Sequence, residues 1–354
     1  MPVYRCVRVR DKLDPSHRMP GRFMPHPAHA AHLEHARGEA VNLDHVATPV
    51  KAWAAVLPAW MMFALLDACA KIAVTSGLDP YLVSFVRFAG HTIVILVLLR
   101  VWAHPRDFLP NRWGVQALRG ATLALGTFTN FQALQTLPLA TTMAIYLAIP
   151  MVVTALSGPM LGEWAGWRRW LAVLLGFAGV MIVVRPGTES FQWAMLWSLA
   201  SLMCASLYFV MTRAMAGTER DESMILIAGA LPALLLLLPA TATATMPQGW
   251  HVWLALAATG VLGSVGHLFI IRASRLAPAP AIAPAVFTQI LWSVLFGWLF
   301  FAHLPDGWTL VGIGVIALSG AYIFRRERQL LRRADAATPG MVSRMDQTVS
   351  HDRR

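Results

Sequence analysis

Two opposite charges stand inside an apolar run of this chain. The stretch FALLDACAKIA, Phe63 to Ala73, places Asp67 and Lys71 four residues apart. A charge at the centre of a bilayer costs about 2.5–3.5 kcal/mol on insertion scales, so an intramembrane ion is retained for function or is paired. Residues at i and i+4 share one face of a helix, where these two can form an ion pair. Two readings stay open: a structural ion pair, or charges that face a water-filled cavity.

Further polar residues interrupt the next apolar segments. Arg87 and His91 are also four residues apart, and we expect Arg87 to join the charges at a cavity and His91 to pack against a neighbouring helix. Amides in a bilayer either hold helices together or meet a polar ligand, and Asn130 in GTFTNFQALQ is the amide we assign to a ligand.

A proline lies close to another candidate site residue, Tyr146. Tyr146 lies four residues before Pro150, which cannot donate a backbone hydrogen bond and so leaves a carbonyl free nearby. Tyr208 and Gln289 are the corresponding polar points further along the chain. The predicted substrate-binding or gating residues are therefore Asp67, Lys71, Arg87, Asn130, Tyr146, Tyr208 and Gln289.

The composition indicates what kind of structure must position these residues. Hydrophobic residues make up 57% of the 354 and charged residues only 13%, whereas a soluble domain carries about 25% charged residues. The chain is predicted to be an integral membrane protein in contact with lipid. The net charge of +11 does not indicate a nucleic-acid partner, because the arginines lie between or beyond the apolar segments and no basic domain remains.

The apolar residues fall into blocks near the roughly 20 residues that cross a bilayer as a helix. The fold predicted from them is an all-α membrane protein with ten transmembrane helices. Their ranges are 52–74, 81–102, 114–135, 138–161, 167–184, 193–212, 223–243, 251–271, 277–301 and 308–324.

The loops between these segments alternate in charge. We number the loops from the one between the first two segments. The even-numbered loops carry pairs or triplets of arginine, such as Arg100, Arg106 and Arg112 in the second loop, whereas the odd-numbered loops carry only Arg185. Positive loops stay in the cytoplasm, which places both termini there. The expected location is a bacterial inner membrane.

The chain also repeats itself. QTLPLATTMAIYLAIP (135–150) resembles SRLAPAPAIAPAVFTQ (274–289), and GWRRWLAVLLGFAGVMIV (166–183) resembles GWTLVGIGVIALSGAYIF (307–324). Repeats of five helices must enter the membrane from opposite sides, so we predict two inverted five-helix repeats. Such repeats are typical of secondary transporters that bind solute near the midplane.

This plan divides the chain into four parts. They are a disordered cytoplasmic arm (1–50), two repeats (52–186 and 193–326) and a basic cytoplasmic tail (327–354). The arm holds six of the twelve histidines, and metal binding there is an alternative to disorder that the sequence favours less.

Several short sequence motifs in the apolar segments resemble those of a known family. FALLDACAK, SFVRF, LPLATTMAIYLAIP, LGEWAGWRRW and GFAGVMIVVRPG are similar to the EamA domain of the drug/metabolite transporter superfamily, over residues 52–326. NFQALQTLPLATTMAIYLAIP looks most like proteins assigned to riboflavin or S-adenosylmethionine uptake. The resemblance implies a secondary transporter that imports a small metabolite by alternating access. A drug or amino-acid exporter of the same superfamily is the alternative.

Other classes of protein have less support in the sequence. The chain contains no phosphate-binding GxxxxGK[ST] loop, no metal-ligand cluster in the helices and no convergent acid, base and nucleophile. We therefore expect no cofactor, no metal and no enzymatic activity. A membrane-embedded enzyme or sensor is the alternative from another class, and the oligomeric state does not follow from the sequence.

Overall fold

The structure is a computed structural model. It describes residues 50–162, 167–189, 191–215, 218–276 and 283–322, with Arg325 and Gln329. Within these ranges the secondary structure is helical and contains no strand. The predicted arm and tail lie outside the described residues, apart from Val50 and Gln329.

The first half of the chain contains six α-helices. They are α2 (Val50–Thr75), α3 (Pro80–Leu98), α4 (Trp113–Leu134), α5 (Leu139–Tyr146), α6 (Ile149–Leu161) and α7 (Trp167–Val184). Two short 3-10 helices, η1 (Val101–Ala103) and η2 (Pro105–Phe108), join α3 to α4.

The described part of the second half contains three long helices, followed by shorter ones. They are α8 (Ala194–Met215), α9 (Asp221–Ala242), α10 (Trp250–Leu276), the 3-10 helix η3 (Ala283–Phe287), α12 (Thr288–Phe301) and a last helix, Gly307–Tyr322. The described parts of all the predicted apolar segments are therefore largely helical.

Within the described ranges, six helices are long and apolar enough to cross a membrane. They are Lys51–Thr75, Pro80–Leu98, Leu139–Leu161, Ala194–Met215, Asp221–Ala242 and Trp250–Ile270. Three shorter apolar helices cover Trp170–Val184, Ala285–Phe301 and Gly307–Tyr322. The 22-residue α4 is absent from both groups. It carries Arg119, Thr127 and Asn130, which lower its hydropathy and, as described below, line internal cavities.

Prolines fix where two helices begin. Pro80 stands at the first position of α3, after Asp79, whose carboxylate accepts a hydrogen bond from the Tyr81 backbone N–H at 2.8 Å. This is a favourable N-cap arrangement. The predicted segment at 138–161 forms one membrane span, Leu139–Leu161, which is interrupted at residues 147–148 between α5 and α6, shortly before Pro150 in the first turn of α6. The missing N–H of proline explains the break.

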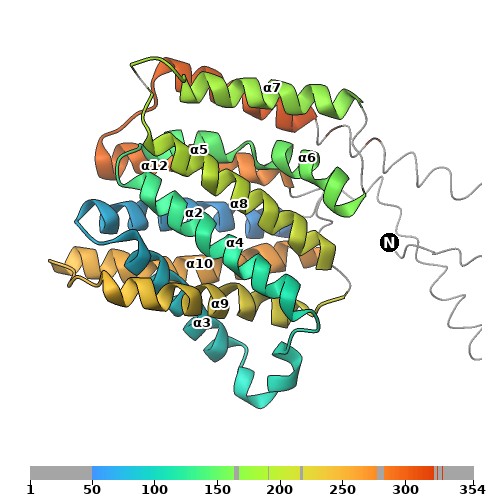
Figure 1. The fold of residues 1–354 in the computed structure, drawn as a ribbon, viewed down its shortest axis with the longest axis vertical. Coiled ribbons are helices and arrows are strands. Elements are labelled where there is room, and N and C mark those ends of the chain that lie inside the picture. The colour runs from blue at the N-terminus through green and yellow to red at the C-terminus, as the bar shows by residue number, and fades with distance from the viewer. Residues whose placement is uncertain are drawn as a thin grey trace, which may run out of the picture. The chain divides into compact units, whose positions relative to one another are not determined.

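The helices lie alongside one another in one bundle, with the loops at its two ends (Figure 1). Helices of the first half pack against helices of the second: α2 against α10, α4 against α8, and α3 against α9. Large apolar side chains such as Trp193 (77% exposed) and Leu238 (78% exposed) point away from the bundle, as expected where a helix faces lipid.

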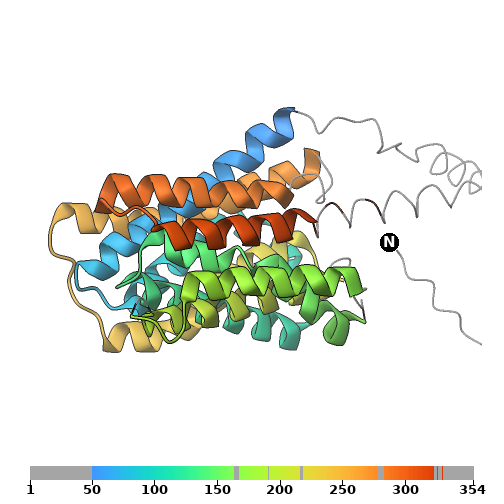
Figure 2. The same cartoon turned by 90° about the horizontal axis from the view of Figure 1, so that it is seen from above.

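Glycines bring α7 and the last helix into direct contact (Figure 2). A Cβ atom built on Gly312 would lie 2.9 Å from the Gly179 carbonyl oxygen, and one on Gly179 would lie 3.1 Å from that of Gly312. The sequence predicts tight packing of these two helices, on their own half or against a second subunit. The structure shows that they pack against each other, across the halves.

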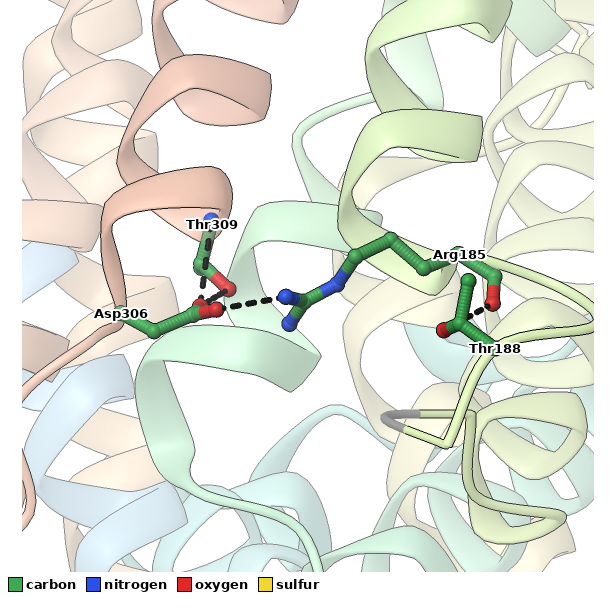
Figure 3. A network of polar contacts seen from close by, with 4 residues as sticks. All are labelled: Arg185, Thr188, Asp306 and Thr309. Atoms are coloured by element: carbon green, nitrogen blue, oxygen red, sulfur yellow. Dashed lines mark hydrogen bonds and ion pairs between the residues drawn. The ribbon is translucent and has the colours of Figure 1, made fainter.

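An ion pair joins the same two helices at one end of the bundle (Figure 3). Arg185, which follows α7, lies with its Nη1 2.7 Å from Asp306 Oδ2. Asp306 also accepts hydrogen bonds from the backbone N–H (3.1 Å) and the hydroxyl of Thr309. It therefore caps the last helix and anchors it to the end of α7.

Candidate functional site

A cavity of about 280 Å³ lies between the two halves of the bundle. Its walls include six of the seven predicted site residues: Asp67, Arg87, Asn130, Tyr146, Tyr208 and Gln289. These side chains come from α2, α3, α4, α5, α8 and α12, and His267 of α10 lines the cavity as well. The cavity is therefore built jointly by helices that are distant in sequence.

Asp67 faces α4 and not its own neighbour Lys71. The Asn130 amide donates a hydrogen bond to Asp67 Oδ1 at 3.2 Å. Arg87 donates to the Thr127 hydroxyl at 2.5 Å, and its guanidinium lies 5.8 Å from the centre of the Phe131 ring. The structure records no ion pair between Asp67 and Arg87, which are both described residues. Each of the two side chains is thus hydrogen-bonded to a neutral partner on α4.

Lys71 occupies a different place from the one predicted. It is 4% exposed, and its Nζ donates to the Leu134 and Leu137 carbonyl oxygens at 2.9 and 2.7 Å. These carbonyls belong to the last residue of α4 and the turn after it, where helix carbonyls lack internal partners. The ion pair with Asp67 is not formed, because the side chain reaches the end of α4. Lys71 is also not among the cavity residues.

His91 packs between helices, as the sequence analysis expects. Its Nε2 lies 3.3 Å from the Ile225 carbonyl oxygen of α9, and its Nδ1 lies 3.3 Å from the Ser264 hydroxyl of α10. The His91 ring also meets the His267 ring edge-on, with centroids 5.6 Å apart. The contact ties α3 to two helices of the second half.

Several residues of the cavity were missed by sequence reasoning. Trp60, Phe63 and Phe209 add an aromatic wall to it. Nothing in the sequence separates these rings from the many aromatic residues that face lipid. A second omission, Arg119 on α4, has a signal that could have been found: a lone arginine well inside an apolar segment.

Two further cavities lie beside the central one, toward one end of the bundle. A second cavity of about 350 Å³ shares Tyr208, His267 and Ile270 with it and is also lined by Arg119 and Asp221. A third, of about 530 Å³, shares Asp221 and Ile225 with the second and reaches Arg272. Asp221 begins α9, so the second and third cavities lie near the end of the bundle where α4 and α9 begin.

The loops at that end are connected by polar contacts. The Glu219 carboxylate accepts hydrogen bonds from the backbone N–H groups of Asn111 and Arg112, at 3.0 and 2.6 Å. Arg220 forms an exposed ion pair with Asp107. These contacts join the loop before α4 to the loop before α9. Among the described residues, no group of three or more His, Cys, Asp or Glu side chains could hold a metal ion.

A bundle of apolar helices around an internal cavity with a few charged and polar side chains is typical of a multi-pass membrane protein that transports a solute. The family comparison agrees with this class. The model of the EamA-like transporter family matches the chain twice, at residues 51–185 and 192–325. The chain belongs to the EamA-like transporter family and is a transporter of small metabolites rather than an enzyme.

Relatives with assigned names share this family. The chain is 29% identical to the riboflavin transporter of Vibrio cholerae, over 78% of this chain and 94% of the relative. It is 26% identical to the S-adenosylmethionine uptake transporter of Rickettsia felis, over 77% of this chain and 94% of the relative. It is also 26% identical to the pseudopaline exporter of Pseudomonas aeruginosa, over 73% and 92%.

A solved structure shows the same fold. One crystal structure superposes with a TM-score of 0.55 and 20% sequence identity, covering 78% of this chain and 98% of the other chain.

Proposed function

We propose that this protein imports a small metabolite across a bacterial inner membrane by alternating access between two inverted five-helix halves, residues 52–186 and 193–326. The observation that carries the proposal is the central cavity, which both halves line and in which Asp67 and Arg87 form no ion pair with each other. Sites of this kind, near the midplane and between repeats, are where secondary transporters bind solute.

The packing of the helices supports an inverted repeat. A two-fold axis would exchange α2 with α8, α3 with α9, α4 with α10, and α5 and α6 with α12. The contact between α2 and α10 then has its counterpart between α8 and α4, and that between α3 and α10 has one between α9 and α4. The contact between α12 and α2 likewise matches that between α6 and α8. The family model also matches once in each half.

Interrupted helices at matching places give further support. The first half breaks between α5 and α6 at residues 147–148, and the second changes from η3 to α12 at residues 287–288. Both breaks adjoin cavity residues, Tyr146 and Gln289. Discontinuous helices in corresponding positions of two repeats are a feature of transporter binding sites.

The charge of the loops supports a cytoplasmic location for both termini and for the loops at 99–112 and 216–220. The chain of cavities leads from the site to that same end. The described conformation therefore corresponds to a state in which the site faces the cytoplasm.

The substrate we propose has a planar ring and a polar or charged remainder. The cavity offers rings from Trp60, Phe63 and Phe209 and opposite charges from Asp67 and Arg87. Riboflavin and S-adenosylmethionine both meet this description, and both occur in the names of relatives. Export is the second candidate, because one relative is named an exporter.

Uptake by cells tests the proposal. Transport-deficient cells that express the chain are given labelled riboflavin or labelled S-adenosylmethionine, and an empty vector is the reference. Saturable uptake of one compound identifies the substrate and the direction. If neither compound enters above the reference despite confirmed membrane expression, the import proposal is wrong and export becomes the leading account.

A further inference from the structure

Arg119 is a buried cation that the site described above does not use. It lies on α4, six residues from the start of that helix, and is 2% exposed. Its guanidinium lines the second cavity, on the path between the central site and the end of the bundle. A charged arginine inside a membrane-spanning helix costs free energy unless it is paired or binds a solute.

All the recorded partners of Arg119 are neutral. Its Nε donates to Gln116 Oε1 at 3.1 Å, and its Nη2 donates to the Met224 carbonyl oxygen at 2.6 Å. Its Nη1 donates to the Tyr208 and Thr212 hydroxyls at 3.1 and 3.4 Å. No ion pair of Arg119 with another described residue is recorded. The positive charge is therefore oriented by hydrogen bonds but not neutralised.

A donor beside Arg119 lacks an acceptor. Gln116 is 0% exposed, and its amide Nε2 has no hydrogen-bond partner among the described residues. A buried amide without a partner costs about 1–3 kcal/mol. Its Oε1 is held by Arg119, which leaves the Nε2 hydrogens for another acceptor. One Nη2 hydrogen of Arg119 also remains after its bonds to Gln116, Tyr208, Thr212 and Met224. A guanidinium without a counter-charge favours an oxyanion as the acceptor of this hydrogen.

Tyr208 links this position to the central cavity. Its hydroxyl accepts from Arg119, its ring lies 5.1 Å from the Arg119 guanidinium carbon, and it lines both cavities. Asp221 lines the outer part of the second cavity and is exposed. A solute that leaves the central site toward α9 therefore passes Arg119 before it reaches this carboxylate.

We infer that Arg119 forms a second binding point, which takes a carboxylate or phosphate group of the transported solute on the cytoplasmic side of the central site. This inference rests on the proposed function and narrows it to solutes that carry an oxyanion. Arg119 then determines specificity, whereas a purely structural Arg119 would only hold α4 against α8 and α9.

Matched pairs of probes distinguish these two roles. Binding to the purified full chain is measured by titration calorimetry in phosphate-free buffer. The first pair is S-adenosylmethionine and decarboxylated S-adenosylmethionine, and the second is riboflavin 5′-phosphate and riboflavin. Inorganic phosphate alone is a separate arm. The variants are Arg119→Gln and Arg119→Lys, and Arg112→Gln, exposed at the same end of the bundle, is the matched control.

We expect the wild-type chain to bind the member that carries the oxyanion about tenfold to a hundredfold more tightly in at least one pair, the usual effect of a hydrogen-bonded charge. Arg119→Gln should remove that preference and leave the affinity for the other member within about twofold. Arg119→Lys should retain part of the preference, because it keeps the charge. Arg112→Gln should bind as the wild type does.

Other results would overturn the inference. The inference is wrong if the wild-type chain binds both members of each pair with equal affinity. It is also wrong if the chain binds none of the probes. If Arg119→Gln weakens the binding of both members of a pair equally, Arg119 has a structural role and holds the helices together. Binding of inorganic phosphate alone that depends on Arg119 indicates a free-anion site and excludes the substrate assignment. If the members without an oxyanion bind as tightly as their partners, the proposed transport function stays intact. A preference for the oxyanion without uptake would contradict only that function.

Discussion

At the scale of single residues, the cavity depends on charges whose partners could be predicted only in part. The sequence indicates that Asp67 and Arg87 lie in apolar helices, and both line the cavity. Their neighbours Asn130 and Thr127 lie on α4, more than 35 residues away, so helix spacing alone cannot pair them. Lys71 shares a helical face with Asp67, yet its long side chain reaches the end of α4 instead. The sequence shows which charged residues lie in apolar helices, but their contacts depend on how distant helices pack together.

Asp67→Asn should lower transport at least about tenfold without changing the amount of protein in the membrane. The substitution keeps the size of the side chain and an oxygen that can accept from Asn130, so it removes mainly the charge. Initial rates over a range of substrate concentrations provide the measurement.

The matched control for this variant is Asp107→Asn. Asp107 is exposed and pairs with Arg220 outside the cavities, where an ion pair contributes little. Equal rates in the Asp67 variant and the wild type would remove Asp67 from the site.

Lys71→Met should lower stability and spare substrate affinity. The change leaves the buried Leu134 and Leu137 carbonyl oxygens without their lysine donor, at a cost of about 1–3 kcal/mol. Thermal unfolding of the purified protein should show a lower Tm, whereas the KM should stay within about twofold. Lys51→Met, at an exposed lysine of the same helix, is the control. A raised KM with an unchanged Tm would contradict this structural role and support the binding or gating role that the sequence predicts for Lys71.

At the scale of helices, the sequence predicts the positions of the apolar segments well but not their interruptions. The segment at 138–161 has continuous hydropathy, and the backbone nevertheless breaks before Pro150. A proline in the first turn of a helix and a proline that kinks a helix look alike in one sequence. The small residues at Gly179 and Gly312 predict close packing, but the identity of the partner helix depends on the whole bundle.

Gly312→Ala tests the contact between α7 and the last helix. The added Cβ would lie 2.4 Å from Val183 Cγ2 and 2.9 Å from the Gly179 carbonyl oxygen. Because the second of these atoms is backbone, the helices must separate, and we expect a loss of about 1–3 kcal/mol in a lower Tm. At Gly314 a Cβ meets nothing within 4 Å, so Gly314→Ala should not destabilise the protein. Equal Tm values for the two variants would contradict the packing described.

Asp306 should make the same contact sensitive to acid. Burial of its carboxyl favours a higher pKa, but the hydrogen bonds from Thr309 and Arg185 and the Arg185 charge lower the pKa below the ordinary value of 3.8. A group with a lowered pKa stabilises the folded state above its unfolded pKa and loses this contribution as the pH falls through the folded value. The stabilisation is therefore present above about pH 5 and fades below about pH 4.

Asp306→Asn provides the measurement of this effect. Asparagine also caps helices, so the variant removes mainly the charge. We expect a Tm about 1–2 °C below wild type at pH 6, the effect of an exposed pair. The difference should shrink at pH 3.5. A constant difference at both pH values would show that the Asp306 charge does not contribute.

At the scale of the whole molecule, the class of protein follows from composition and repetition. A chain with 57% hydrophobic residues in blocks must bury its backbone polar groups in helices. The repeated motifs agree with the two matches of the family model. The shape of the site could not be predicted, because residues of α2, α3, α4, α5, α8, α10 and α12 meet only after the two halves interlock. The direction in which the cavities open depends on the conformation and has no signature in the sequence.

The most direct test of the central claim is solute counterflow in proteoliposomes that contain only the purified protein. Vesicles are loaded with unlabelled riboflavin or S-adenosylmethionine and placed in a trace of the same compound in labelled form. We predict a transient accumulation of label for one compound with the wild-type chain, and a rate at least about tenfold lower with Asp67→Asn. No accumulation of either compound, or equal accumulation in the variant, would contradict transport through the cavity that Asp67 and Arg87 line.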